Sequence, residues 1–215
     1  MTEISKRIIT SFLMISIFLI SLLNNYLLFF LLIFCFYQTF YEFFAILDKI
    51  FINRYKINFL SSLLIVLLIL SYIFGFSWYS LNLGTEKDKI YLLLIISISV
   101  SSDIGGYFFG KLFKGRKLSK ISPNKTFSGM VGAYLLSFVI VIFTFKSFIK
   151  SETLLIIIFL VSTISQLGDL FISYLKRKSK LKDTGKILPG HGGILDRFDG
   201  LIFAILIGSI IKIFI

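Results

Sequence analysis

Acidic and glycine residues gather in one short polar stretch near the C-terminal end of the sequence. The stretch KDTGKILPGHGGILDRFDG, residues 182–200, holds the single histidine, His191, and the carboxylates of Asp196 and Asp199. Hard cations such as Mg²⁺ are held by one or two carboxylates together with substrate phosphates and water. The backbone N–H groups of a glycine-rich loop such as residues 189–193 can enclose an anion. These residues predict a site for a divalent cation and a phosphate. The alternatives are helix capping by Asp196 and a purely structural histidine.

A further acidic residue precedes this stretch inside an apolar segment. In STISQLGDLFISYLKRK, residues 162–178, a helix places Gln166, Asp169, Ser173 and Lys176 on one face. An ionisable side chain within an apolar span is costly and usually faces a partner or a wet cavity. We therefore expect Asp169 to join the carboxylates that follow it. The alternative is an ion pair with Lys176 that only positions the end of the helix.

A second polar region, SSDIGGYFFGKLFKGRKLSKISPNKTFSG, covers residues 101–129. Asp103 stands late in an apolar segment, again a costly place for a charge. Lys125 and Thr126 follow a proline turn, and we expect Lys125 to face a phosphate. The sequence contains no G-x-x-x-x-G-K-[ST] motif, which excludes a P-loop nucleotide site. The other lysines of this region have a simpler interpretation, contact with anionic lipid headgroups.

The composition places these residues in a membrane protein. Only 16% of the 215 residues are charged and 57% are hydrophobic, whereas about a quarter of a soluble domain is charged. The apolar residues form long uncharged blocks typical of transmembrane helices. The net charge of +12 does not indicate a nucleic-acid partner, because the basic residues lie between apolar blocks, as in cytoplasmic loops. The single cysteine, Cys35, excludes an internal disulfide.

The apolar blocks predict an all-α membrane protein, a polytopic helical bundle of about seven transmembrane helices that forms one domain over residues 1–215. Residues 8–41 carry no charge and would make roughly 51 Å of helix, too long for a hydrocarbon core of about 30 Å. We therefore place a break at Asn24–Asn25. The predicted spans are residues 7–23, 26–46, 57–80, 90–110, 130–149, 153–175 and 199–215. Residues 1–100 then supply N-terminal spans, and residues 101–215 form a catalytic half.

Basic residues are distributed unevenly over the predicted loops. One side of the membrane holds Lys87, Lys89, Lys146, Lys150 and Lys212, and the other holds the rest of the 23 Lys and Arg residues. This asymmetry predicts a cytoplasmic N-terminus and two long cytoplasmic loops, about 111–129 and 176–198. The N-terminal apolar run has no A-x-A-like cleavage site, so we expect an uncleaved first span. Carboxylates, basic groups and a glycine loop at this membrane face suit phosphoryl or nucleotidyl transfer to a lipid.

The stretch SYLKRKSKLKDTGKILPGHGGILDRFD, residues 173–199, resembles the signature of the phosphatidate cytidylyltransferase (CDP-diacylglycerol synthase) family. That signature consists of S-x-x-K-R, K-D, H-G-G and D-R-x-D at fixed spacings. Its fixed positions here are Ser173, Lys176, Arg177, Lys182, Asp183, His191, Gly192, Gly193, Asp196, Arg197 and Asp199. SQLGDLF, D-x-x-x-Y-x-x-G from Asp103 and SP-x-K-T extend the resemblance over roughly the C-terminal half. The sequence departs from the family at Ser128, where an acid is usual, and at Ile172, where Glu is usual.

The resemblance implies Mg²⁺-dependent transfer of CMP from CTP to phosphatidic acid, giving CDP-diacylglycerol and pyrophosphate. It implies Mg²⁺ ligands at Asp169 and Asp196. The implied catalytic residues are Lys176, Arg177, Asp183, His191, Arg197 and Asp199, and the implied substrate-binding residues are Asp103, Lys125, Thr126, Ser173, Gly192 and Gly193. The expected partners are CTP, phosphatidic acid and membrane lipids, with no nucleic acid, and a homodimer is left open.

Three other functions match parts of the sequence. A CTP-dependent polyprenol or phytol kinase would share the membrane location and the nucleotide, but the full signature argues against it. A cation transporter would need acids spread across the depth of the bilayer, whereas these acids gather at one face. A structural membrane subunit would not account for the loop motif. The abundance of Ile, Phe, Lys and Asn indicates an AT-rich bacterial genome, so we expect the bacterial inner membrane.

Overall fold

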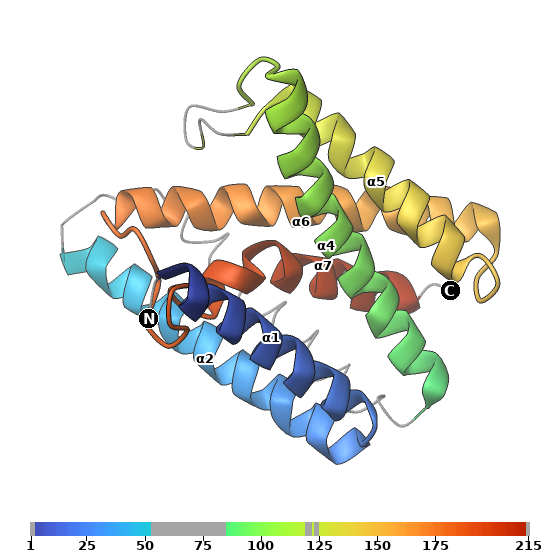
Figure 1. Ribbon diagram of the computed structural model, residues 1–215, viewed down its shortest axis with the longest axis horizontal. Coiled ribbons are helices and arrows are strands. Elements are labelled where there is room, and N and C mark those ends of the chain that lie inside the picture. The colour runs from blue at the N-terminus through green and yellow to red at the C-terminus, as the bar shows by residue number, and fades with distance from the viewer. Residues whose placement is uncertain (1–2, 53–84, 119–121, 123–124, 214–215) are drawn as a thin grey trace. The chain divides into compact units, whose positions relative to one another are not determined.

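The computed structural model of the chain describes residues 3–52, 85–118, 122 and 125–213. Within these residues every regular element is an α-helix (Figure 1). The helices are α1 (Glu3–Leu22), α2 (Asn25–Ile52), α4 (Glu86–Phe113), α5 (Phe127–Phe145), α6 (Ser151–Lys178) and α7 (Leu195–Ile213). The β-type pairings in this part of the chain are isolated bridges, Lys117 with Thr126 and Leu188 with Gly192. The predicted all-α class is confirmed for the described residues.

Five of the described helices, α1, α2, α4, α5 and α6, are long and apolar enough to cross a membrane. The break predicted at Asn24–Asn25 is confirmed, since α1 ends at Leu22 and α2 begins at Asn25. Helix α5 ends at Phe145 rather than at residue 149, because the chain turns there and the N–H of Phe148 bonds to the carbonyl of Phe145 (3.0 Å).

Helix α7 and the residues between α2 and α4 leave the span count open. Helix α7 is 19 residues long but is not among these five helices, because too many charged residues interrupt its apolar sequence. These charged residues are Asp196, Arg197, Asp199 and Lys212. The predicted span 57–80 lies outside the described residues. The count of seven and the single-domain organisation therefore stay predictions.

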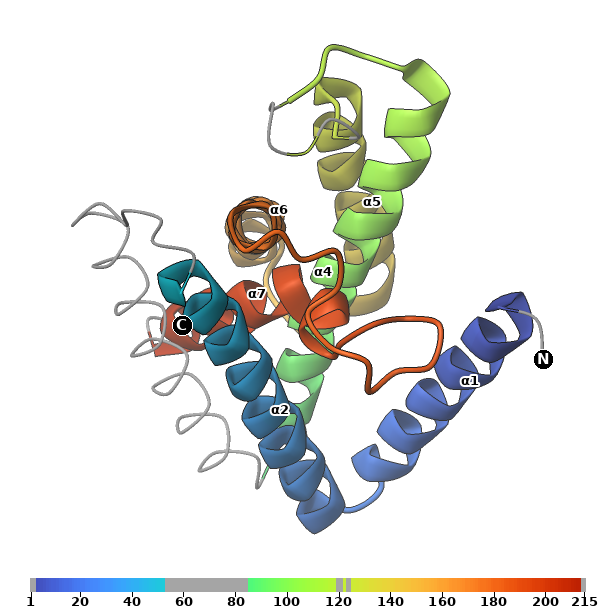
Figure 2. The same cartoon turned by 90° about the vertical axis from the view of Figure 1, so that its left-hand side faces the viewer.

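The described residues divide into two compact units. The first contains residues 3–52, 85–89 and 175–198. In it, α1 and α2 form a helical hairpin, whose turn is closed by bonds from the N–H groups of Leu23 and Asn24 to the carbonyls of Ile20 and Ser21. Figure 2 shows residues 179–194 as an orange loop between these two helices. This unit thus carries most of the family signature.

The second unit contains residues 90–118, 122, 125–174 and 199–213. Small residues bring α4 and α5 into contact here: a Cβ on Gly105 would lie 2.4 Å from the carbonyl oxygen of Gly132. Such residues let helix backbones approach closely in membranes. Hydroxyl contacts between buried serines join the helices, Ser101 to Ser137 (3.2 Å), Ser99 to Ser165 (2.9 Å) and Ser102 to Ser162 (3.0 Å). These contacts hold the part of α4 that carries Asp103.

Candidate active site

Helix α6 ends in a tight turn directly before the glycine-rich loop, residues 179–194, which we call the signature loop. Lys180 has a left-handed conformation (φ 56°). The N–H of Leu181 bonds to the carbonyl of Lys176 (3.0 Å), and that of Lys180 bonds to the carbonyl of Arg177 (3.2 Å). This is the Schellman pattern of a helix C-terminus. It leaves Lys176 on the last turn of α6, beside the start of the signature loop.

The signature loop folds back on itself between Leu188 and Gly192. The N–H of Leu188 donates to the carbonyl of Gly192 (2.9 Å), and the carbonyl of Leu188 accepts from the N–H groups of His191 (2.9 Å) and Gly192 (3.1 Å). Gly192 has φ 86°, a region that glycine adopts without strain. A Cβ there would lie 2.7 Å from Oδ2 of Asp196 and 3.2 Å from Cβ of Asp183. Gly192 therefore lets the backbone approach both acidic residues.

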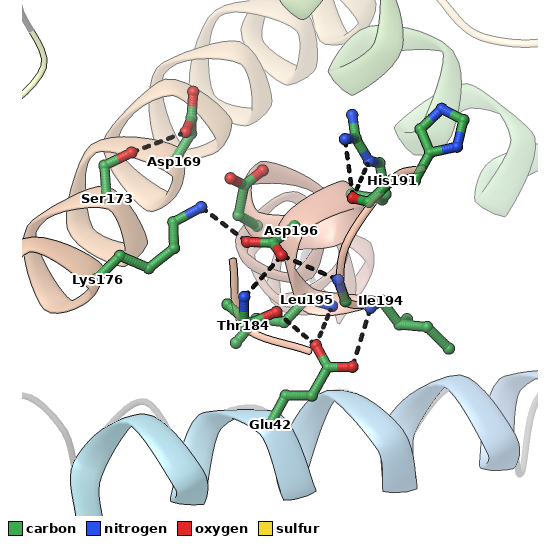
Figure 3. Close-up of polar contacts among 12 residues, drawn as sticks. Glu42, Asp169, Ser173, Lys176, Thr184, His191, Ile194, Leu195 and Asp196 are labelled. Atoms are coloured by element: carbon green, nitrogen blue, oxygen red, sulfur yellow. Dashed lines mark hydrogen bonds and ion pairs between the residues drawn. The ribbon is translucent and has the colours of Figure 1, made fainter. Parts of the chain in front are cut away.

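Asp196 is enclosed by donors from the signature loop and from α6 (Figure 3). Its Oδ2 accepts hydrogen bonds from the backbone N–H groups of Thr184 (2.7 Å) and Gly193 (3.0 Å), and its Oδ1 accepts from Nζ of Lys176 (2.9 Å). Its side chain is 6% exposed. Burial alone would raise the pKa of Asp196, but the hydrogen bonds from Gly193, Thr184 and Lys176 outweigh it and lower the pKa below its ordinary value. The signature thus positions an ionised carboxylate beside an ammonium group.

His191 lies between two arginines. Its backbone carbonyl accepts from Nε (3.2 Å) and Nη2 (2.9 Å) of Arg197, and Nε of Arg7 donates to the neighbouring carbonyl of Gly190 (2.9 Å). Nε2 of His191 lies 3.4 Å from Oγ of Ser11, while Nδ1 is shielded from solvent and has no hydrogen-bond partner among the described residues. Desolvation and the charges of Arg197 and Arg7 lower the pKa of His191. Its imidazole is therefore neutral near pH 7, which suits hydrogen bonding rather than proton donation.

Charged residues of the predicted site also lie together in the second unit. Nζ of Lys125 pairs with Oδ2 of Asp169, and each side chain is 27% exposed. Oγ of Ser173 donates to Oδ1 of Asp169 (3.4 Å), and Asp103 interacts electrostatically with both Asp169 and Lys125. The alternative pairing of Asp169 with Lys176 is wrong, because Lys125 binds Asp169 and Lys176 binds Asp196.

Thr126 and Ser128 organise the start of α5. Thr126 is the N-cap, and its Oγ1 accepts from the N–H of Gly129 (3.1 Å). The hydroxyls of Thr126 and Ser128 are 3.0 Å apart, and Oγ of Ser128 accepts from the N–H of Gly115 (3.2 Å). Ser128 thus joins the preceding loop to α5 at the position where the resembled family usually carries an acid. Substrate contact by Thr126 stays a prediction.

The other predicted residues belong partly to the first unit and partly to the second. Arg177 and Asp183 are exposed, and Gly193 is buried. Oδ1 of Asp199 accepts the backbone N–H of Gly200 (2.9 Å).

The two predicted Mg²⁺ ligands belong to different units, Asp169 to the second and Asp196 to the first. Within the described residues, no three His, Cys, Asp or Glu side chains lie close enough to hold a metal by themselves. Sites for Mg²⁺ often use one or two carboxylates, and water and substrate phosphates complete them. Asp103 and Asp169 in the second unit, and Asp196 in the first, each offer carboxylate oxygens, the donors that suit Mg²⁺. Its binding stays a prediction.

Sequence reasoning missed the part that the N-terminal helices play in this site. Arg7 and Thr10 of α1 donate to the carbonyls of Gly190 and Pro189 (both 2.9 Å). Glu42 of α2 accepts hydrogen bonds from Thr184 and Ile194 of the signature loop. The signal for Glu42 was present, since it is an acid inside the predicted apolar span 26–46.

Comparison with known families matches most of the chain to one model. The family model described as the cytidylyltransferase family matches residues 50–214. The match includes α4, α5, α6, the signature loop and α7.

Several bacterial proteins are similar to the chain, each named phosphatidate cytidylyltransferase. The relative from Rickettsia conorii is 40% identical over 140 residues, which is 60% of this chain and 61% of the relative. The relative from Helicobacter pylori is 39% identical over 127 residues, 57% of this chain and 48% of the relative. The relative from Staphylococcus saprophyticus is 44% identical over 127 residues, 57% of this chain and 49% of the relative. The matches thus span about half to three fifths of the length of these relatives.

Proposed function

The chain belongs to the cytidylyltransferase family, and from this we propose that it transfers the CMP group of CTP to phosphatidic acid. A phosphate oxygen of phosphatidic acid attacks the α-phosphorus of CTP. The bond from that phosphorus to the bridging oxygen of the β-phosphate breaks, and pyrophosphate leaves. The products are CDP-diacylglycerol and pyrophosphate. The names of the bacterial relatives support this pair of substrates.

One observation carries the proposal: signature residues that are far apart in sequence converge on one carboxylate. Lys176, Thr184 and Gly193 all donate to Asp196, within 2.7 to 3.0 Å. Cytidylyl transfer brings two polyanions together, so it depends on neutralising and aligning phosphates more than on proton chemistry. An ionised carboxylate, an ammonium group and a glycine-rich backbone in one place suit that requirement.

The proposed reaction requires little proton transfer by residues of this site. The second pKa of a phosphate monoester is about 6, so phosphatidic acid is already largely dianionic at neutral pH and needs no strong general base. Lys176, Arg177, Arg197 and Lys125 would neutralise phosphate charge on the two substrates. His191, neutral because of its lowered pKa, would hydrogen-bond the nucleotide rather than donate a proton.

Magnesium is part of the proposal. When bound, Mg²⁺ would supply Lewis-acid chemistry and neutralise charge on the phosphates. Asp169 and Asp196 would hold it, and Asp103, Asp183 and Asp199 would support the charge balance. Each of the two main carboxylates already has a lysine partner, so a cation would compete with or displace that ammonium group.

We propose the orientation of the protein in the membrane from the distribution of basic residues over the predicted loops. Basic residues concentrate on the side of the predicted loops that includes the signature loop, which supports a cytoplasmic N-terminus and a cytoplasmic site. The bacterial origin of the relatives supports the inner membrane. CTP would then reach the site from the cytoplasm, while the acyl chains of phosphatidic acid stay in the bilayer.

The test is transfer of radiolabel in detergent, with purified protein, phosphatidic acid, Mg²⁺ and CTP labelled at either the α- or the γ-phosphate. Label from the α position in the lipid, with none from the γ position, is expected. Label from the γ position would instead identify a lipid kinase. No transfer by folded protein would overturn the proposed activity.

A further inference from the structure

A buried acid in α2 contacts the signature loop but lies outside the residues matched by the family model. Glu42 is 2% exposed, and the match begins at residue 50. An ionisable residue within an apolar span is costly and normally has a specific partner. The partners of Glu42 belong mainly to the signature loop and to the start of α7 (Figure 3).

The carboxylate of Glu42 accepts four hydrogen bonds from the described residues. Oε1 accepts from Nε2 of Gln38 (3.1 Å) and from the N–H of Ile194 (3.0 Å). Oε2 accepts from Oγ1 of Thr184 (2.6 Å) and from the N–H of Leu195 (2.9 Å). An ionised carboxylate offers about four lone-pair sites and no donor, so this set of partners matches it fully.

Two of these bonds cap α7 from another helix. The first N–H groups of a helix have no acceptor within the helix. Ile194 precedes the first residue of α7, Leu195, and its side chain cannot accept a hydrogen bond. Glu42 supplies the missing acceptor, and its charge suits the positive end of the helix.

The signature loop is shaped around this carboxylate. A Cβ on Gly185 would lie 2.8 Å from Oε1 of Glu42, and a Cβ on Gly193 would lie 2.2 Å from Oε2. Thr184 links the two acids, because its hydroxyl donates to Glu42 while its N–H donates to Asp196. Gly193 also donates its N–H to Asp196. The two carboxylates therefore both bind Thr184 and the backbone of residues 193–195, two parts of the loop that meet here (Figure 3).

We infer that Glu42 is a positioning residue that acts through Thr184 and the backbone of residues 193–195 to hold Asp196 and the glycine-rich backbone in the geometry that nucleotide binding requires. The expected effect of Glu42 on kinetics rests on the proposed function, because that proposal assigns the signature loop to CTP. The expected effect of Glu42 on structure, the ordering of residues 184–195, does not depend on the proposed function.

The primary test is Glu42→Gln, which keeps the size of the side chain. Glutamine has one acceptor oxygen, and its NH₂ group would face N–H donors on the other side. Displacement of a group in the site by about 1 Å can lower the catalytic rate about 100-fold. We expect the displacement here to act on nucleotide binding, so KM for CTP should rise about 10- to 100-fold. We expect a smaller change in kcat and an unchanged KM for phosphatidic acid. Thr184→Val removes one donor only and should act in the same direction with a smaller effect.

The matched control is Ser137→Ala in the second unit. Ser137 is fully buried and bonds to Ser101 and to the carbonyl of Ile98 (both 3.2 Å), so its loss also removes buried hydrogen bonds between helices. A purely structural loss lowers the fraction of active protein and leaves both KM values unchanged, which is the result expected of this control.

The outcomes separate this inference from the proposed function. A folded Glu42→Gln protein with both KM values unchanged would overturn the inference. If the wild-type protein transfers no cytidylyl group, the proposed function fails, and amide hydrogen exchange of residues 184–195 decides instead. Faster exchange there in Glu42→Gln than in wild type supports the inference, and equal exchange overturns it. If Glu42→Gln does not fold, Thr184→Val decides by the same measurements.

Discussion

Replacing Asp196 by asparagine separates the charge of this residue from its hydrogen bonds. The asparagine carbonyl can still accept the N–H groups of Thr184 and Gly193, which lie 2.7 and 3.0 Å from Oδ2 in the wild-type protein. Its NH₂ group then faces the ammonium of Lys176, which places one donor against another. We therefore expect Asp196→Asn to fold, to be less stable and to be nearly inactive.

The magnitude follows from the burial of the pair. The side chain of Asp196 is 6% exposed and that of Lys176 is 17% exposed. Removing one partner of a buried ion pair costs about 3–5 kcal/mol, and Lys176 retains some contact with solvent, so we expect about 3 kcal/mol of lost stability. Removing one preorganised charge-stabilising group typically lowers kcat about 100- to 1000-fold, and we expect a loss of that size.

A double-mutant cycle distinguishes the two effects. The four proteins are wild type, Asp196→Asn, Lys176→Met and the double variant. Stability is measured by far-ultraviolet circular dichroism during unfolding in detergent, and activity by transfer of α-phosphate label to lipid. The double variant leaves no uncompensated charge, so its stability should recover to within about 1 kcal/mol of wild type. Its activity should not recover, because both side chains are assigned to phosphate or metal.

Two results would refute this reasoning. Activity of Asp196→Asn within about threefold of wild type would remove Asp196 from the reaction. Recovery of activity together with stability in the double variant would show that the pair only stabilises the signature loop.

Four further predictions concern Asp169, Asp196, Gly192 and His191. Lys125→Met leaves Asp169 without its ammonium partner, so the apparent affinity for Mg²⁺, measured as the activation constant, should change in Lys125→Met and not in Lys111→Met. Folding lowers the pKa of Asp196 from 3.8, so the contribution of this carboxylate to stability is complete above pH 3.8. That contribution is lost as the pH falls through the lowered pKa, and Asp196→Asn should flatten this part of the stability–pH curve. Gly192→Ala should cost at least about 1–2 kcal/mol of stability in thermal unfolding, because φ of Gly192 is 86° and the new Cβ would lie 2.7 Å from Oδ2 of Asp196. A variant as stable as the wild type would contradict the left-handed turn. The pKa of His191 is lowered from 6.5, so the pH–activity profiles of wild type and His191→Gln should run parallel above pH 6.5, and a divergence there would indicate a protonated imidazole.

Local features of the chain were predictable because they depend on neighbouring residues and on the thickness of the bilayer. The break at Asn24–Asn25 follows from a charge-free run too long for one span. The contact of Ser173 with Asp169 follows from the period of a helix, which places residues four apart on one face. The later end predicted for α5 was wrong, because hydropathy alone does not show where the chain turns after Phe145.

By itself, the sequence determined the all-helical class of the protein and its candidate site residues. Spacing within the signature is read along the chain, and each carboxylate, lysine and glycine in it is identified without knowledge of the fold. Only the tertiary structure decided which charges meet. Asp169 binds Lys125 rather than Lys176, and Glu42 binds Thr184 from 142 residues away. Such pairings depend on how distant segments pack, and a hydrogen bond or ion pair forms only where packing brings donor and acceptor within about 3 Å.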